Sequence, residues 1–158
     1  MIKPSMLKPG CRIGVVSPSY WLKKQYMEKT SKFFQDKGYT MVMGNSNSMK
    51  WGPFAGTPQE RADDIHHMFS NPKIEAIICA RGGYGANRVL PLLDYNLIRD
   101  NPKIFMGYSD ITAYLTSITQ KTGLVTFHGP MMVSYKKGFV NYNFQTMERI
   151  LNGTPDFK

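Results

Sequence analysis

Short apolar runs alternate along the chain with amphipathic stretches. This alternation is typical of parallel strands joined by crossover helices. The runs expected as strands lie at Arg12–Ser17, Tyr39–Met43, Lys73–Cys79, Lys103–Met106 and Leu124–Phe127. The pattern therefore predicts an α/β fold, a parallel sheet of about five strands flanked by helices.

Helices are expected where apolar residues recur every three or four positions. Thr57 and Glu60 can form a capping box around Pro58 at the first helical position, which marks a strong helix start. In the last amphipathic stretch we expect four apolar side chains to face inward, namely Phe144, Met147, Ile150 and Leu151. The expected helices are Lys23–Lys37, a helix beginning after Thr57, Asn87–Leu93, one capped by Asp94 and running through Arg99, Ile111–Thr122 and Phe144–Leu151.

The composition is that of a globular chain. Its 158 residues are 42% hydrophobic and 20% charged, which suits one compact domain. No apolar run approaches the ~20 residues that cross a bilayer, and the first residues have no secretory signal pattern. The two cysteines cannot form a disulfide framework. These features exclude a membrane span, a coiled-coil rod and a small secreted scaffold, and they favour a cytoplasmic location.

The net charge of +9 leaves three readings open. Proteins that bind nucleic acid contact its phosphates with clustered basic residues. Here the lysines are dispersed along the chain, and no basic helix or zinc finger accompanies them. A positive field could instead attract acidic small substrates. A solubilising surface is favoured over both of these readings, and neither nucleic acid nor a membrane is an expected partner.

Ser109 is the first candidate for chemistry. It lies between a strand ending at Met106 and a helix beginning near Ile111, so it is expected on a sharp turn at the carboxyl edge of the sheet. That placement is typical of a nucleophile elbow, in which the amide of Asp110 would point toward an oxyanion. The alternative is a helix N-cap, where serine and aspartate are favoured in any protein.

The second candidate is the glycine-rich turn Arg81–Gly85, which follows a strand directly. Glycines allow a tight turn and bring backbone amides close to an anion, although a plain strand-to-helix turn would use the same residues. Two such turns after parallel strands open on the same edge of one sheet. The turn and Ser109 are therefore expected to share a site.

The remaining reactive side chains do not complete a catalytic triad. A serine nucleophile needs a base, but His66, His67 and His128 are each explained as solvated, packing or hydrogen-bonding residues. Cys11 and Cys79 are expected as buried thiols, with a reactive thiol at Cys79 as the alternative.

Four blocks in order resemble the LD-carboxypeptidase family, serine peptidases of bacterial murein recycling together with the related microcin C immunity proteins. They include the sequences ICARGGYG and GYSDIT, and the strand that begins at Arg12 fits the start of the family pattern. The blocks are Ala55–Arg61, Ile78–Tyr95, Asn101–Thr112 and Lys121–Pro130. The resemblance implies a flavodoxin-like or class I glutamine amidotransferase-like N-terminal domain.

The resemblance also implies roles for individual residues. Ser109 would attack the amide bond before a C-terminal D-amino acid of a murein peptide. The amides of Asp110 and Gly83 would form the oxyanion hole, and the substrate would be bound by Arg81, Gly82 and Tyr84. No metal and no organic cofactor are implied.

Family members are about twice this length, and their catalytic Glu and His lie in a C-terminal domain. Because the chain stops at Lys158, we expect only the nucleophile-bearing N-terminal domain over residues 1–158, inactive alone. Its expected partners are the murein peptide substrate and the missing C-terminal domain, and a homodimer is also considered. Within Gly129–Tyr142 the apolar side chains are expected to be poorly ordered or covered by another copy, namely Met131, Met132, Val133, Tyr135 and Phe139.

Two rival functions stay open. A microcin C immunity-type peptidase would use the same serine on a peptidyl nucleotide. A non-catalytic domain would use the two glycine-bearing turns to hold an acidic peptide.

Overall fold

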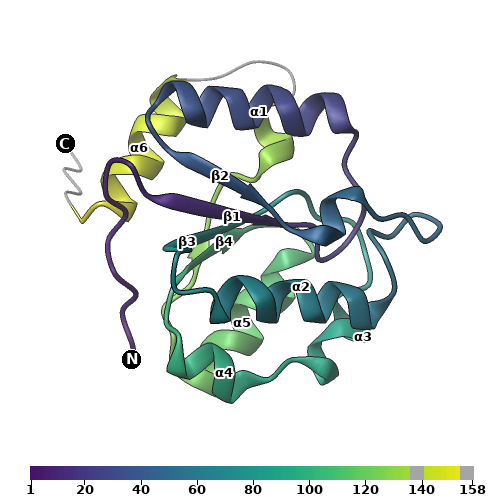
Figure 1. The fold of residues 1–158 in the computed structure, drawn as a ribbon. Helices are drawn as coiled ribbons and strands as arrows, with labels where there is room; N and C mark the ends of the chain where they lie inside the picture. Colours follow the sequence, from purple (N-terminus) through teal and green to yellow (C-terminus); the bar gives the residue numbers. More distant parts are fainter. Residues whose placement is uncertain (136–140, 154–158) are drawn as a thin grey trace.

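The computed structural model describes residues 1–135 and 141–153 as an α/β domain (Figure 1). Its five-stranded sheet has the order β2-β1-β3-β4-β5, and every neighbouring pair is parallel. This order is the flavodoxin-like one. The strands are β1 (Arg12–Val16), β2 (Thr40–Met43), β3 (Ala76–Cys79), β4 (Ile104–Gly107) and β5 (Phe127–His128). The predicted fold class is confirmed.

Helices cover both faces of the sheet. In Figure 1, α1 and α6 lie over one face, and α2, α4 and α5 lie over the other. The helices are α1 (Lys24–Asp36), α2 (Pro58–Ser70), α3 (Ala86–Val89), α4 (Tyr95–Asp100), α5 (Ile111–Thr122) and α6 (Asn141–Leu151), and the 3-10 turns are η1 (Asn45–Ser48), η2 (Leu90–Leu92) and η3 (Met132–Tyr135).

The strands divide their side chains between two cores. Successive residues of a strand point to opposite faces, so Ile78 packs with the helices of one side and Ile77 with those of the other. The same alternation holds for Ile104 and Phe105 on β4. Every residue of β3 and β4 is buried, because a parallel sheet is covered on both faces.

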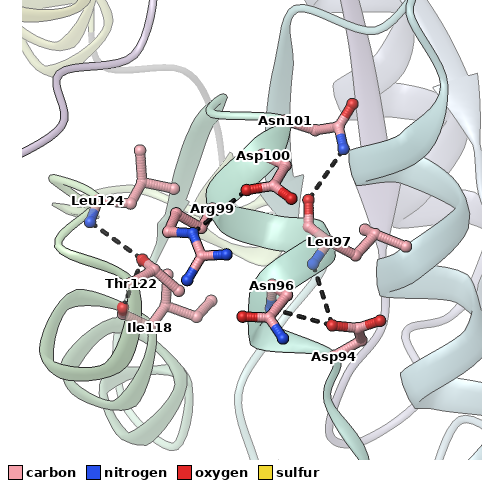
Figure 2. A network of polar contacts seen from close by, with 9 residues as sticks. All are labelled: Asp94, Asn96, Leu97, Arg99, Asp100, Asn101, Ile118, Thr122 and Leu124. Carbon is pink, nitrogen blue, oxygen red and sulfur yellow. Dashed lines mark hydrogen bonds and ion pairs between the residues drawn. The ribbon is translucent and has the colours of Figure 1, made fainter.

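The helix boundaries follow from local hydrogen bonds. Thr57 and Glu60 form the expected capping box at the start of α2. Figure 2 shows the same logic at α4, where the Asp94 carboxylate accepts from the amides of Asn96 and Leu97 at 2.9 and 3.0 Å. At the end of α5, the Thr122 hydroxyl donates to the carbonyl of Ile118 and accepts from the amide of Leu124 (Figure 2).

The fifth strand differs from the prediction. It covers only Phe127–His128, whereas Leu124–Phe127 was expected. The residues before it bond instead to the N-terminal segment: Ile2 donates to the carbonyl of Gly123 at 2.7 Å and accepts from the amide of Val125 at 2.9 Å. The chain end, far away in sequence, therefore takes the hydrogen bonds that would have lengthened β5.

Two expectations about apolar side chains are wrong. Ile150 is 40% exposed, because the buried face of α6 is centred on Phe144, Met147 and Leu151 and one residue step turns a helix by about 100°. Met131, Met132 and Tyr135 were expected to be poorly ordered or covered by another copy. They are buried within their own chain, and Phe139 lies outside the described residues.

Backbone bonds explain why this segment is buried. The amide of Val133 donates to the carbonyl of Ala80 at 2.9 Å, and the hydroxyl of Thr30 on α1 donates to the carbonyl of Met132 at 3.0 Å. The segment is thereby held between the end of β3 and the inner face of α1.

Candidate active site

The turns after β1, β3 and β4 meet at the carboxyl edge of the sheet. The connection from β1 runs to β2 on one side, while β3 lies on the other side of β1, so the strand order reverses there. In open α/β sheets, ligands bind at the carboxyl edge beside such a reversal. The two candidate turns of the sequence lie at this edge.

Ser109 has the backbone strain expected of an elbow. Its φ is 64°, and it is the one non-glycine residue with positive φ in the part of the chain that the structure describes. Such a conformation is costly and persists where the surrounding structure imposes it. The cause is the sharp passage from β4 into α5, where a side chain on Gly107 would come within 2.6 Å of Ile111. The Ser109 residue is exposed.

The glycine-rich turn lies directly against Ser109. A Cβ added to Gly82 would come 2.8 Å from the Ser109 Cβ and 2.9 Å from its Oγ, and 3.3 Å from the amide nitrogen of Asp110. Gly83 has φ 145°, and a Cβ there would meet the Tyr20 ring at 2.4 Å. The structure therefore brings together the serine, the amide of Asp110 and the turn that the sequence singled out.

The alternative interpretation of this position was a helix N-cap. The Asp110 side chain, however, makes no capping hydrogen bond to α5. Its carboxylate accepts from the hydroxyl of Ser19 at 2.6 Å and from the amide of Ala86 at 3.2 Å. Asp110 therefore ties the turn after β1 and the start of α3 to the turn that carries Ser109. Sequence reasoning missed Ser19, and no local signal identifies it, since its partner is 91 residues away.

A buried arginine joins the turn after β1 to the glycine-rich turn through hydrogen bonds. Arg61 on α2 is 0% exposed, and its Nη1 donates to the carbonyl of Pro18 at 2.8 Å and to that of Gly85 at 3.5 Å. Its guanidinium lies 5.1 Å from the ring centroid of Phe54. Burial lowers the pKa of this guanidinium below its ordinary value. The sequence signal available was a charged residue beside Ala62 on the helix face that carries Ile65 and Met68.

Arg81 and Tyr84 belong to the glycine-rich turn that packs on Ser109. The Arg81 Nε donates to the carbonyl of Gly82 at 3.2 Å, and its guanidinium lies 5.6 Å from the ring centroid of Tyr20. Tyr84 is 55% exposed. Arg81 thus lies beside Gly82, the glycine that packs on Ser109, and Tyr84 is open to solvent two residues further along the same turn.

Within the described residues, no histidine forms a hydrogen bond with Ser109. His66 accepts a hydrogen bond from the amide of Asp94 at 2.8 Å, and His67 is exposed on α2. His128 is exposed at the end of β5, beside the ring of Tyr108.

The two thiols are inert in this arrangement. Cys11 and Cys79 are both buried and free, as expected. Burial raises the pKa of each thiol, most strongly for Cys79. A thiolate is the reactive form of cysteine, so the alternative of a reactive thiol at Cys79 finds no support.

Over residues 1–135 and 141–153, no group of three histidine, cysteine or acidic side chains is arranged to hold a metal ion. In the same ranges no helix is both long enough and apolar enough to span a bilayer.

A cavity of about 800 Å³ lies beside the start of α1 and the end of β2. Its lining includes Trp21 and Lys50 but not Ser109.

Together these features define an α/β domain that presents a strained serine and a glycine-rich turn at the carboxyl edge of a parallel sheet. The family profile described as the LD-carboxypeptidase N-terminal domain matches residues 13–129. The chain belongs to this family.

Curated relatives carry two kinds of name. The chain is 41% identical to the probable murein peptide carboxypeptidase of Bacillus subtilis, over 82% of this chain and 41% of that protein. It is 43% identical to the microcin C7 self-immunity protein MccF of Escherichia coli, over 80% of this chain and 38% of that protein. The chain thus spans less than half the length of these relatives.

Solved structures of both kinds of protein superimpose on this chain. Apo MccF superimposes with a TM-score of 0.89 at 34% identity, covering 94% of this chain and 46% of MccF. The muramoyltetrapeptide carboxypeptidase of Oxalobacter formigenes gives a TM-score of 0.81 at 25% identity, covering 88% of this chain and 47% of that one.

Proposed function

We propose that this chain is the nucleophile-bearing domain of a serine carboxypeptidase that removes a C-terminal D-amino acid from murein peptides. The observation that carries the proposal is the strained backbone of Ser109 against the Gly82 turn. The names of relatives such as the Bacillus subtilis protein support the substrate class. A cytoplasmic setting belongs to the same proposal.

In this mechanism the Ser109 Oγ attacks the carbonyl carbon of the last peptide bond. The negative charge that develops on the carbonyl oxygen is stabilised by the backbone N–H groups of Asp110 and Gly83. Breaking the C–N bond releases the D-amino acid and leaves an acyl ester on Ser109. A water molecule then hydrolyses the ester and restores the serine.

The Ser109 proton must pass to a general base and then to the leaving amine. The family resemblance assigns this work to a Glu and a His in a C-terminal domain, and the chain spans only 41% of its Bacillus subtilis relative. We therefore propose that both groups come from outside residues 1–158. It follows that the chain alone turns over no substrate at a measurable rate.

A microcin C immunity-type reaction is the second candidate. It is favoured by the TM-score of 0.89 with MccF, against 0.81 with the muramoyltetrapeptide carboxypeptidase. The same serine would then cleave the amide of a peptidyl nucleotide. The family resemblance, in contrast, puts the sequence RGGYG of Arg81–Gly85 nearer the murein branch.

A chimaera tests the proposal. Residues 1–153 replace the aligned part of the Bacillus subtilis relative, and release of D-Ala from a murein tetrapeptide is measured with a peptidyl nucleotide as competitor. We expect release that falls by at least about 10³-fold in Ser109→Ala. The matched control Ser70→Ala, an exposed serine at the end of α2, should keep full activity. Equal activity of the Ser109→Ala chimaera would overturn the assignment, and preferential cleavage of the nucleotide would favour the second candidate.

A further inference from the structure

The free carboxylate at the end of the substrate distinguishes a carboxypeptidase substrate from an internal peptide bond. An arginine suits this group, because its planar guanidinium donates two parallel hydrogen bonds to a carboxylate. Resting on the proposed function, a cation of this chain close to Ser109 is expected to receive that group.

The distance along the substrate limits the choice. In a substrate ending in one amino acid, three bonds separate the attacked carbonyl carbon from the terminal carboxyl carbon, so these two carbons lie within about 4 Å. A hydrogen bond adds about 3 Å, so the receiving nitrogen lies within roughly 7 Å of the carbon that Ser109 attacks.

Three arginines lie near the glycine-rich turn, and two of them are unsuitable. Arg61 is 0% exposed beneath the turn, so no substrate can touch it. Arg88 lies on α3, six residues after Gly82, and none of its described contacts is with Gly82 or Ser109. Arg81 directly precedes Gly82, the residue whose α-carbon faces the Ser109 side chain.

The Arg81 side chain is held over the turn. Its Nε donates to the carbonyl of the neighbouring Gly82 at 3.2 Å, and its guanidinium lies 5.6 Å from the Tyr20 ring centroid. The described residues offer it no carboxylate within ion-pair distance. Its two terminal nitrogens therefore keep their donors for a ligand, and little side-chain entropy remains to be lost on binding.

We infer that the Arg81 guanidinium, oriented by the Gly82 carbonyl and the Tyr20 ring, receives the terminal carboxylate of the peptide whose last amide bond lies at Ser109. Arg81 is then the residue that makes the site specific for chain ends. The peptidyl nucleotide of the second candidate function presents no such carboxylate next to the cleaved bond, so this role belongs to the murein-type substrate.

A titration of the chain itself tests this inference without turnover. Two probes, N-acetyl-L-Lys-D-Ala and its C-terminal amide, are added to the ¹⁵N-labelled protein and followed by amide chemical shifts. We expect the wild type to bind the acid about tenfold more tightly than the amide. Arg81→Gln should remove that preference while leaving the amide's affinity unchanged, and Arg81→Lys should restore part of it.

Arg88→Gln is the matched control, since it removes the same charge from the next turn of chain and should keep the preference. Loss of the preference to the same degree in Arg88→Gln would mean that only the general positive field acts, which overturns the inference. It is equally overturned if Arg81→Gln still prefers the acid, or if the wild type shows no preference or no binding. Thermal unfolding of each variant checks that the fold is intact.

The outcome is separable from the proposed function. Ser109→Ala should leave the acid preference in place, because the serine makes no part of the carboxylate contact. In the active chimaera, Arg81→Gln should raise the KM for the tetrapeptide with a smaller effect on kcat. Serine-dependent release with an unchanged KM in Arg81→Gln would refute the Arg81 role alone. An acid preference without serine-dependent release would refute the function and leave the binding role standing.

Discussion

At the scale of single residues, the site depends on side chains that are absent as much as on the serine. Gly82 leaves just enough room for Ser109, because an added Cβ would fall 2.8 Å from the serine Cβ. That distance is shorter than real carbon contacts, so one of the two turns would have to move. The proposed oxyanion donors and the proposed nucleophile would then no longer share one geometry.

Gly82→Ala is therefore expected to destabilise the domain by about 1–3 kcal/mol through overpacking, and to abolish D-Ala release in the chimaera. Urea unfolding and the release assay measure the two effects. Gly38→Ala is the comparison, since Gly38 has φ 91° and open space around it. That variant should lose stability through backbone strain while keeping activity, and an active Gly82→Ala would contradict the prediction.

Ser19 offers a second test at this scale. Among the described residues, the Asp110 carboxylate accepts from the Ser19 hydroxyl and the Ala86 amide, so Ser19→Ala leaves it with one of these two donors. We expect Ser19→Ala to lower the free energy of unfolding by about 1.5–3 kcal/mol relative to the wild type, the range for hydrogen bonds to charged groups. Urea unfolding measures the difference. Ser48→Ala, which removes an exposed hydroxyl bonded to a carbonyl, should change stability little. Equal losses of stability in the two variants would argue against a stabilising role of the Ser19–Asp110 hydrogen bond.

At the scale of elements, local signals at the strand and helix ends decide where the site lies. The capping box begins α2 at Pro58 and thereby aims Arg61, three residues later, at the turns above it. Gly107 lets α5 start close to β4, which forces the elbow at Ser109. The residues at which α2 and α5 begin therefore determine where Arg61 and Ser109 lie.

Thr57→Ala is expected to lower the free energy of unfolding by about 1 kcal/mol, because the amide of Glu60 loses its acceptor and the Glu60 carboxylate loses the bond from the Thr57 hydroxyl. Thr57→Ser keeps the hydroxyl oxygen and should recover most of the loss. Thermal or urea unfolding measures both variants. A serine variant as unstable as the alanine variant would show that the methyl packing of Thr57 matters more than the cap.

At the scale of the whole molecule, a buried lysine links α2 to β4. The Lys103 ammonium donates to the carbonyls of Met68 and Asn71 at the end of α2, and burial lowers the pKa of Lys103 to about 8. In the unfolded chain the ordinary lysine value near 10.5 applies. Between these two values the unfolded state binds more protons than the native state, so this group makes stability rise with pH.

We expect the wild type to gain up to about 2 kcal/mol relative to Lys103→Met when the pH is raised from 7 to 9.5. Urea unfolding of both proteins at each pH measures the difference, and the comparison cancels the titration of the other groups. Parallel pH profiles for the two proteins would show that Lys103 keeps its ordinary pKa in the folded state.

The sequence by itself determined the order and type of the elements and the two turns that carry the candidate chemistry. The helix Ile111–Thr122 has the bounds that its apolar spacing predicts, and the glycine-rich turn follows a strand as expected. These features depend on neighbours within a few positions, where hydrophobic period, caps and glycines act directly.

Tertiary structure alone decided the contacts between distant segments. The Ser19 bond to Asp110, the burial of Arg61 beneath Pro18 and the pairing of Ile2 with the segment before β5 join parts of the chain that no local pattern connects. Ile150 likewise faces solvent because of where α6 packs and not because of its own hydrophobicity. Periodicity predicts which face of an element is apolar, but the partner of each polar group is known only when strand order brings two turns to one edge.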